Sequence, residues 1–279
     1  MNIKYTIDSD SGLMKLRFKK NILNPLGDNK DIFEKYILPM LAMNDKFVLT
    51  GSLSLKLLGF EPVDKVGDFD FGLTDTFTEE DYMSIKNFFG LHDSRHGYNW
   101  EEQSVKDIKF DPKAHMWQLF KSWNEEVNEE LGRSLQFKLD IFNDEMLRKR
   151  DIITVYYDDF PVRLVHPSIT LSYRMRYALD TRSSTTYKYW VKMKEFMDNA
   201  KSYYNHMKAI QKMNMRVHEH NANIEGDKKK VEYLRHLIKT REVNTDNFFE
   251  KVFNETIDPF TIMIEKEQEQ FKQNLTNAK

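Results

Sequence analysis

The pattern of apolar and polar positions predicts strands and helices in alternation at the start of the chain. Residues 2–7 and 13–18 alternate on either side of an Asp-Ser-Gly turn, which predicts a β-hairpin. Residues 31–43 carry apolar side chains at helical spacing, and Pro39 is expected to kink or end this helix. The chain therefore opens with both types of secondary structure.

The same alternation of elements continues to about residue 166. Thr78 is expected to cap the helix that follows it, over 79–89. Gly59 is expected to end the helix over 52–58. The elements expected here are strands over 46–50, 68–73, 135–143, 151–157 and 161–165, and helices over 52–58, 79–89 and 111–131.

From residue 167 onward the pattern is helical. A helix over 168–179 is followed by one whose apolar residues recur at three- and four-residue steps, namely Trp190, Met193, Met197, Ala200, Tyr204 and Met207. Such a seam is typical of helices that pack on helices. Residues 221–227 break the pattern, and further helices are expected over 228–241 and 247–273. We therefore predict an α/β domain over 1–166 and a helical domain over 167–279.

Composition restricts the classes of protein that fit this pattern. The 279 residues have a formal net charge of −2, so the chain lacks the strongly basic character of extensive nonspecific nucleic-acid binders. The absence of cysteine excludes disulfides and thiolate metal sites. The N-terminus lacks the apolar core of a signal peptide, and no apolar stretch reaches membrane-spanning length. We expect a soluble, cytoplasmic protein with no membrane partner, in the host cytoplasm if it is viral.

Two aspartates, Asp68 and Asp70, lie one residue apart inside an apolar run, where their like charges repel each other. Upstream, a predicted strand ends at Thr50 and is followed by Gly51 and Ser52 at the start of a helix. Glycine lets the backbone approach a ligand closely, and the free N–H groups of a helix N-terminus suit a phosphate. Two carboxylates facing a bound triphosphate would form a Mg²⁺ site, because Mg²⁺ takes oxygen ligands.

Asp140 is the best candidate for a third carboxylate. It lies in the middle of the predicted strand over 135–143, between apolar residues. Three carboxylates suit a site for two metal ions roughly 3.5–4 Å apart. We therefore expect Asp140 to bind one ion and to help deprotonate an attacking hydroxyl.

These residues resemble the signature of the nucleotidyltransferase superfamily that includes DNA polymerase beta. That signature is Gly-Gly or Gly-Ser, a short helix, Asp-x-Asp or Asp-x-Glu, and a later carboxylate on another strand. The matching positions are Gly51, Ser52, Asp68, Asp70 and Asp140. The stretch GSLSLKLLGFEPVDKVGDFDFGL is most similar to the abortive-infection and toxin-type branch. The resemblance implies an α/β (α+β) fold with a mixed sheet flanked by helices, followed by a helical C-terminal domain.

The resemblance extends to residues 165–193, where many members carry basic residues that grip the triphosphate. Lys188 matches the second of these basic positions, and Arg174 or Arg176 matches the first. The family often has an acidic residue shortly after that lysine, whereas here Val191 and Lys192 follow Trp190. The implied nucleotide-binding residues are therefore Gly51 and Ser52 together with Lys188 and Arg174.

The resemblance implies an enzyme that uses two Mg²⁺ ions to move a nucleoside monophosphate from a nucleoside triphosphate to an acceptor hydroxyl. The acceptor is open: an RNA 3′ end such as that of tRNA, a protein or a small molecule all fit. A toxin of a toxin–antitoxin pair and a phage-encoded enzyme are two versions of this hypothesis. The alternative is a catalytically inactive protein of the same fold, acting as a structural component or binding a protein partner through the helical domain.

Other candidate residues favour structural interpretations. His92 and His96 have metal-ligand spacing but lie between glycines, and His218 and His220 are expected in a polar turn. Residues 227–241 carry six basic and two acidic side chains. This pattern is typical of a solvated helix face, and contact with nucleic-acid phosphates is the alternative.

Overall fold

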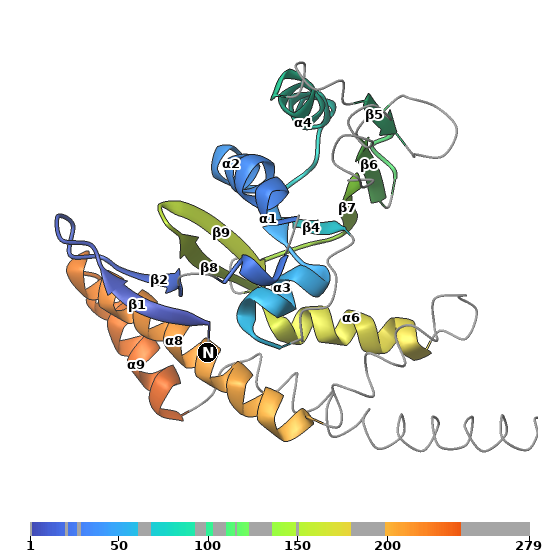
Figure 1. Cartoon of the computed structure of the whole chain (residues 1–279). Helices are drawn as coiled ribbons and strands as arrows, with labels where there is room; N and C mark the ends of the chain where they lie inside the picture. The colour runs from blue at the N-terminus through green and yellow to red at the C-terminus, as the bar shows by residue number, and fades with distance from the viewer. Residues whose placement is uncertain are drawn as a thin grey trace, which may run out of the picture. The chain divides into compact units, whose positions relative to one another are not determined.

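The protein divides into two compact units (Figure 1). One comprises Met1–Asp8 and Met14–His166, and the other comprises Ser9–Leu13 and Pro167–Lys279. The structure, a computed structural model, describes residues 2–19, 22–26, 29–60, 68–92, 99–102, 110–114, 116–122, 136–148, 151–179 and 199–240.

Nine strands of the described chain form one mixed sheet in the first unit, in the order β1-β2-β8-β9-β3-β4-β7-β6-β5. The pairs β2–β8, β3–β9 and β4–β7 are parallel, and the other neighbouring pairs are antiparallel. The strands are β1 (Ile3–Ile7), β2 (Met14–Phe18), β3 (Phe47–Leu49), β4 (Phe69–Leu73), β5 (Asn99–Glu102), β6 (Met116–Ser122), β7 (Gln136–Met146), β8 (Ile152–Tyr157) and β9 (Phe160–Val165). The predicted α/β (α+β) class with a mixed sheet flanked by helices is confirmed.

The helical segment of residues 29–43 continues through Pro39, so the helix does not end there. It comprises α1 (Asn29–Ile32), a π turn over Phe33–Ile37 and α2 (Leu38–Met43). The amide of Leu38 donates to the carbonyl of Phe33, five residues back. Because proline has no N–H to donate, this wider turn immediately before it lets the helical path continue.

The helix predicted over 111–131 is wrong where the structure describes it, because Met116–Ser122 forms β6. This strand pairs antiparallel with β7 along its whole length. The ring of Trp117 is buried, with its centroid 4.7 Å from that of Phe77 and 5.5 Å from that of Phe110. Strand pairing and aromatic burial thus override the local helical pattern. Residues 123–131 lie outside the described part of the chain.

The other helices described in the first unit are α3 (Gly51–Leu58) and α4 (Glu79–His92), besides a 3₁₀ turn over Asn24–Leu26. The leucines of α3 are buried, and Gly59 ends this helix with φ 91° as predicted. Thr78 caps α4 as predicted, since its hydroxyl oxygen accepts from the amide of Asp81 at 3.2 Å. The strongly apolar strands β3, just before α3, and β4, between α3 and α4, form the centre of the core.

The second unit is helical where it is described, with α6 (Pro167–Leu179), α8 (Ala200–Ile224) and α9 (Lys228–Thr240). Helices α8 and α9 pack together, and Gly226 with φ 78° lies in the turn between them. Met207 of the predicted seam is buried, but Trp190, Met193 and Met197 and the helix expected over 247–273 lie outside the described residues. No described helix combines the length and apolar character needed to cross a bilayer.

Candidate functional site

A tight corner joins β3 to α3. Strand β3 ends at Leu49, Thr50 stays extended, and Gly51 begins the helix with φ 66°, a backbone conformation that favours glycine. The amide of Thr50 donates to the carbonyl of Asp70 at 2.8 Å, which continues the pairing of β3 with β4. This corner therefore brings the start of α3 to the beginning of β4.

The register of β4 and β7 places two aspartates opposite each other. Asp70 of β4 pairs with Asp140 of β7 in the parallel ladder, so their side chains leave the same face of the sheet. Phe69 and Phe71 are fully buried on the opposite face, which fixes the orientation of the strand. Asp68 lies one residue before β4 and shares the face of Asp70.

The structure brings the three predicted carboxylates together. One oxygen from each of Asp68, Asp70 and Asp140 lies within 4.8 Å of the others. Asp140 is 6% exposed, and the other two are half-buried. At an effective dielectric constant of about 20, two full charges at this separation repel by roughly 3 kcal/mol. A divalent cation fits this cluster, because it would replace mutual repulsion by attraction and takes carboxylate oxygens as ligands.

Gly51 is held against the aspartate cluster. A Cβ at position 51 would lie 1.8 Å from Oδ2 of Asp70 and 2.7 Å from its Cγ. The sequence predicted a glycine that lets a ligand approach, but its close neighbour in the structure is the Asp70 side chain. The sequence pattern does not indicate this contact, because it depends on the pairing of β4 beside the corner.

The other predicted residues have different positions. Ser52 follows Gly51 in the first turn of α3 and is half-buried. Arg174 lies on α6 in the second unit and is 6% exposed. Arg176 lies on the same helix, whereas Lys188 falls outside the described residues. The roles of Arg174 and Lys188 in nucleotide binding therefore stay predictions.

The histidine predictions meet the structure only in part. His218 and His220 lie on α8, so the polar turn expected for them is wrong. The helical pattern of α8 runs past both residues before Gly226, and polar side chains fit its solvent-facing side. His92 is the last residue of α4, and His96 lies outside the described residues.

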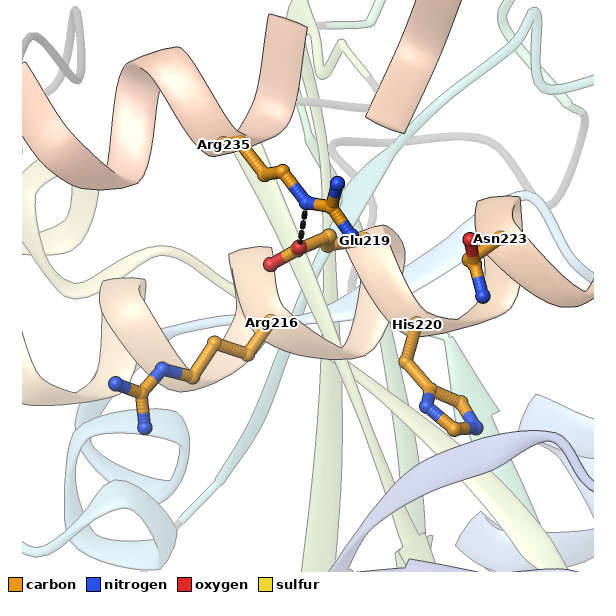
Figure 2. A pocket seen from close by; sticks show the side chains of 5 residues that line it. All are labelled: Arg216, Glu219, His220, Asn223 and Arg235. Atoms are coloured by element: carbon orange, nitrogen blue, oxygen red, sulfur yellow. Dashed lines mark hydrogen bonds and ion pairs between the residues drawn. The ribbon is translucent and has the colours of Figure 1, made fainter. Parts of the chain in front are cut away.

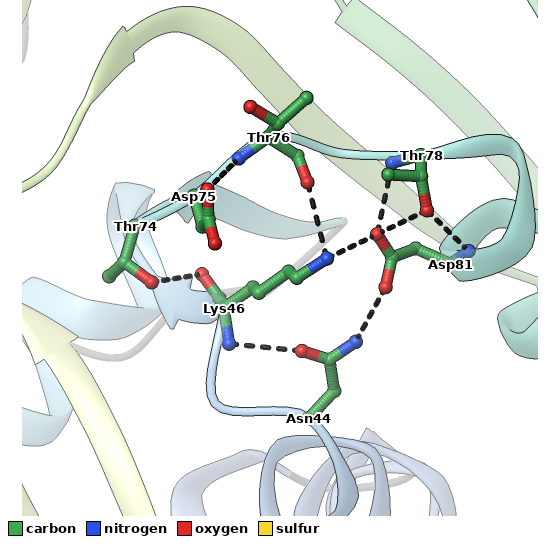
Figure 3. Close-up of polar contacts among 7 residues, drawn as sticks. All are labelled: Asn44, Lys46, Thr74, Asp75, Thr76, Thr78 and Asp81. Atoms are coloured by element: carbon green, nitrogen blue, oxygen red, sulfur yellow. Dashed lines mark hydrogen bonds and ion pairs between the residues drawn. The ribbon is translucent and has the colours of Figure 1, made fainter.

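A second acidic site, which the sequence did not indicate, lies at the other end of the β3–β4 pair (Figure 3). Lys46 precedes β3, and its ammonium nitrogen lies 2.7 Å from Oδ2 of Asp81 and donates to the carbonyl of Thr76 at 3.2 Å. Asn44 donates to Oδ1 of Asp81 at 3.3 Å. The amide and hydroxyl of Thr78 donate to Oδ2 at 2.9 and 2.8 Å. These bonds tie the loop after β4 to the start of β3.

The pKa values of this ion pair move in opposite directions. Burial acts to raise the pKa of Asp81, but hydrogen bonds from Lys46 and Thr78 outweigh burial and hold it below its ordinary value of 3.8. The hydrogen bond to Asp81 raises the pKa of Lys46 above 10.5. Both groups are therefore held in their charged forms over the whole neutral range.

Comparisons with known proteins add little to this geometry. No protein-family model and no curated protein sequence matches the chain. One similar solved structure is a "putative nucleotidyltransferase from H. pylori", 13% identical, covering 91% of this chain and 99% of its own, with a TM-score of 0.43. A likeness this low supports no inference about the present chain, so the site is interpreted from its own residues.

Proposed function

We propose that the protein is a Mg²⁺-dependent nucleotidyltransferase that moves a nucleoside monophosphate from a nucleoside triphosphate to an acceptor hydroxyl. The observation that carries this proposal is the meeting of Asp68, Asp70 and Asp140 within 4.8 Å beside the Gly51 corner. Three oxygen donors around one point suit hard divalent cations, and the start of a helix beside them suits phosphate. The first unit would be the catalytic part.

In this proposal each aspartate has a defined role. Asp68 and Asp70 would hold the metal ions, and Asp140 would share one of them. Bound Mg²⁺ would supply Lewis-acid chemistry by neutralising phosphate charge and making the acceptor hydroxyl more acidic. The cluster is built on paired strands, whose ladders and buried opposite face keep the carboxylates in place.

The reaction is an in-line displacement at the α-phosphorus. The acceptor oxygen forms a new bond to that phosphorus, and the bond to the oxygen bridging the α- and β-phosphorus atoms breaks, so that pyrophosphate leaves. The hydroxyl proton passes to a carboxylate oxygen of Asp140. The amides at Gly51 and Ser52 would seat the triphosphate, and Arg174 and Lys188 would grip it.

The test is transfer of label from each α-³²P-labelled nucleoside triphosphate to total cellular RNA or to lysate protein, with Mg²⁺ and the full chain. We expect transfer with the wild-type protein, loss with chelator and loss in Asp70→Asn. Glu80→Gln is the matched control, because Glu80 is an exposed residue of α4 and loses the same charge.

Two results would contradict the proposal. Transfer that persists in Asp70→Asn would exclude the aspartate cluster as its source. Absence of transfer from every nucleotide, together with absence of metal-dependent nucleotide binding, would favour the inactive structural protein over the enzyme. RNA or lysate from a toxin–antitoxin or phage host would serve in this assay only as a source of acceptor.

A further inference from the structure

The α8–α9 hairpin, residues 199–240, is strongly basic in a chain that is otherwise acidic. It holds nine lysines and arginines against four acidic residues, a formal charge of +5, whereas the rest of the chain carries −7. It also holds four of the eight histidines. The overall net charge of −2 therefore conceals a concentrated positive module.

Seven of the nine basic side chains of this hairpin are exposed. Lys228, Lys229, Lys230, Arg235 and Lys239 of α9 are all exposed, while Val231 faces the helix partner and is buried. On α8, Lys212 and Arg216 are exposed and lie one turn apart. Glu219 and Asn223 continue that stripe at the next helical steps, so this side of α8 is polar throughout.

A polar pocket of about 210 Å³ joins the two helices (Figure 2). It is lined by Arg216, Glu219, His220 and Asn223 of α8 and by Arg235 of α9. Nε of Arg235 donates to Oε1 of Glu219 at 2.7 Å. A guanidinium has five N–H donors, so this bond leaves four for a ligand. Two guanidiniums, one imidazole and one amide thus line this pocket, together with the carboxylate of Glu219.

His220 forms a wall of this pocket and is held in place by the chain. Its Nε2 lies 2.9 Å from the carbonyl oxygen of Gly12, which can only accept, so Nε2 carries the proton. Gly12 belongs to the same unit as α8. The bond ties the Ser9–Leu13 segment to the hairpin and orients the ring before any ligand enters.

We propose that the exposed basic face of the α8–α9 hairpin binds the phosphodiester backbone of a single-stranded RNA, with one phosphate seated between Arg216 and Arg235. The proposal rests on the proposed function, because this RNA would present the acceptor hydroxyl. A row of positive charges along a helix can contact successive phosphates of a nucleic-acid backbone. One guanidinium can donate two parallel hydrogen bonds to the oxygens of a phosphate.

An exposed aromatic side chain on α9 favours single-stranded RNA over a duplex. Tyr233 is 60% exposed and lies one turn from Lys229, so an unpaired base can stack on its ring while the backbone meets the lysine. Bases of a duplex are already stacked and do not need such a platform. Unpaired segments are also the parts of RNA that proteins ordinarily contact through aromatic side chains.

Fluorescence anisotropy with a labelled 20-nucleotide RNA tests the proposal, using the full chain without nucleotide or metal. Lys212→Gln with Arg216→Gln should weaken binding about tenfold and lower the salt slope of log K by about 1.4, or 0.7 per lost contact. The control is Lys4→Gln with Lys113→Gln, two exposed residues of the first unit with the same charge change. This control should leave binding unchanged.

A second variant should strengthen binding, which a merely structural role would not do. Glu219→Gln removes the carboxylate that occupies Arg235 and preserves the size of the side chain, so affinity should rise about threefold. Glu225→Gln is the matched control, because Glu225 is exposed at the end of α8 and loses the same charge without a bond to Arg235. It should raise affinity less.

The outcomes separate this inference from the proposed function. Asp70→Asn should bind RNA like the wild type while losing transfer; RNA binding without transfer by the wild type would contradict the enzyme alone. Transfer without any loss of RNA binding in the Lys212 and Arg216 variant would overturn the hairpin inference alone. Equal or tighter binding of duplex DNA of the same sequence, or of an acidic polypeptide such as polyglutamate, would also overturn it.

Discussion

Two acidic sites lie at opposite ends of the β3–β4 pair, and they use carboxylates in different ways. At one end, Asp81 is surrounded by donors from the chain, with Lys46 at 2.7 Å and further hydrogen bonds from Thr78 and Asn44. At the other end, one oxygen from each of Asp68, Asp70 and Asp140 lies within 4.8 Å of the others. The first arrangement stabilises the fold, whereas the second concentrates like charge at one point.

The contrast teaches how to separate structural from functional acidic residues. A carboxylate whose bonds join two segments of the chain should matter for stability when it is changed. Clustered carboxylates oppose folding because their like charges repel each other. A bound cation relieves this repulsion. Four changes to the chain test this difference, in decreasing order of effect.

The largest effect is expected for nucleotidyl transfer. Asp70→Asn should lower the rate on the order of a thousandfold, the equivalent of about 4 kcal/mol of transition-state stabilisation. Asp81→Asn should leave the rate within about threefold, because Asp81 lies at the far end of the strands. Initial rates of label transfer measure both variants. A similar loss in both would remove the distinction between the two sites.

Next is a comparison of two glycines with positive φ. Gly51→Ala should abolish most transfer, because its Cβ would lie 1.8 Å from the Asp70 oxygen and must displace it. Gly226→Ala has the same backbone strain, with φ 78°, but its Cβ would meet nothing within 4 Å.

Both alanine variants should lose about 1–2 kcal/mol of stability from left-handed backbone strain. Gly51→Ala should lose more, because the collision adds to this strain. Thermal unfolding and transfer rates are measured together. Equal stability and full activity in both variants would show that the contact between Gly51 and Asp70 has no importance.

Asp81→Asn should lower the free energy of unfolding at neutral pH by about 1–2 kcal/mol, since it removes a charged acceptor of four donor groups. The lowered pKa of Asp81 means that its contribution is complete above pH 3.8 and is lost as pH falls through the folded-state value. The stability gap between the variant and the wild type should therefore shrink below pH 3.8.

The raised pKa of Lys46 gives stability a second pH dependence, of the opposite sign. Its contribution is present below pH 10.5 and is lost as pH rises through the folded-state value. Urea unfolding at several pH values measures both pH dependences. A stability gap that stays constant from pH 7 down to pH 2.5 would contradict the assignment of Asp81 to this ion pair.

The smallest effect is expected for Thr78→Ala, at about 0.5–1 kcal/mol of stability with no change in transfer. The hydroxyl of Thr78 both donates to Asp81 and accepts from its amide, so its loss frees the first turn of α4. Urea unfolding measures it against Ser84→Ala, an exposed residue in the middle of the same helix. A larger loss for Ser84 than for Thr78 would be inconsistent with the cap.

Much of the fold was predictable because most strands carry their own pattern. The hairpin of β1 and β2 and the buried strands β3 and β4 follow from alternation and apolar runs, and the end of α3 follows from Gly59. Strand β6 did not, because Met116–Ser122 resembles a helix locally and becomes a strand only through pairing with β7. The continuation through Pro39 was not predictable either, since the π turn over Phe33–Ile37 has no recognised signal in the local sequence.

The candidate site shows the same division. The Asp-x-Asp spacing predicts that Asp68 and Asp70 share a face, and the strand pattern predicts a further carboxylate at Asp140. The register that sets Asp70 opposite Asp140 is a property of the sheet and has no local signal. The closeness of Gly51 to Asp70 and the partners of Asp81 are long-range contacts for the same reason.

The most direct test of the central claim is Mn²⁺ binding, measured by isothermal titration calorimetry with the full chain and no nucleotide. Mn²⁺ is a probe that takes the same oxygen ligands as Mg²⁺. We predict saturable binding by the wild type and by Asp81→Asn, and at least about tenfold weaker binding by Asp70→Asn. Equal binding by the wild type and Asp70→Asn, or no binding by the wild type, would contradict the claim that these aspartates form a metal site.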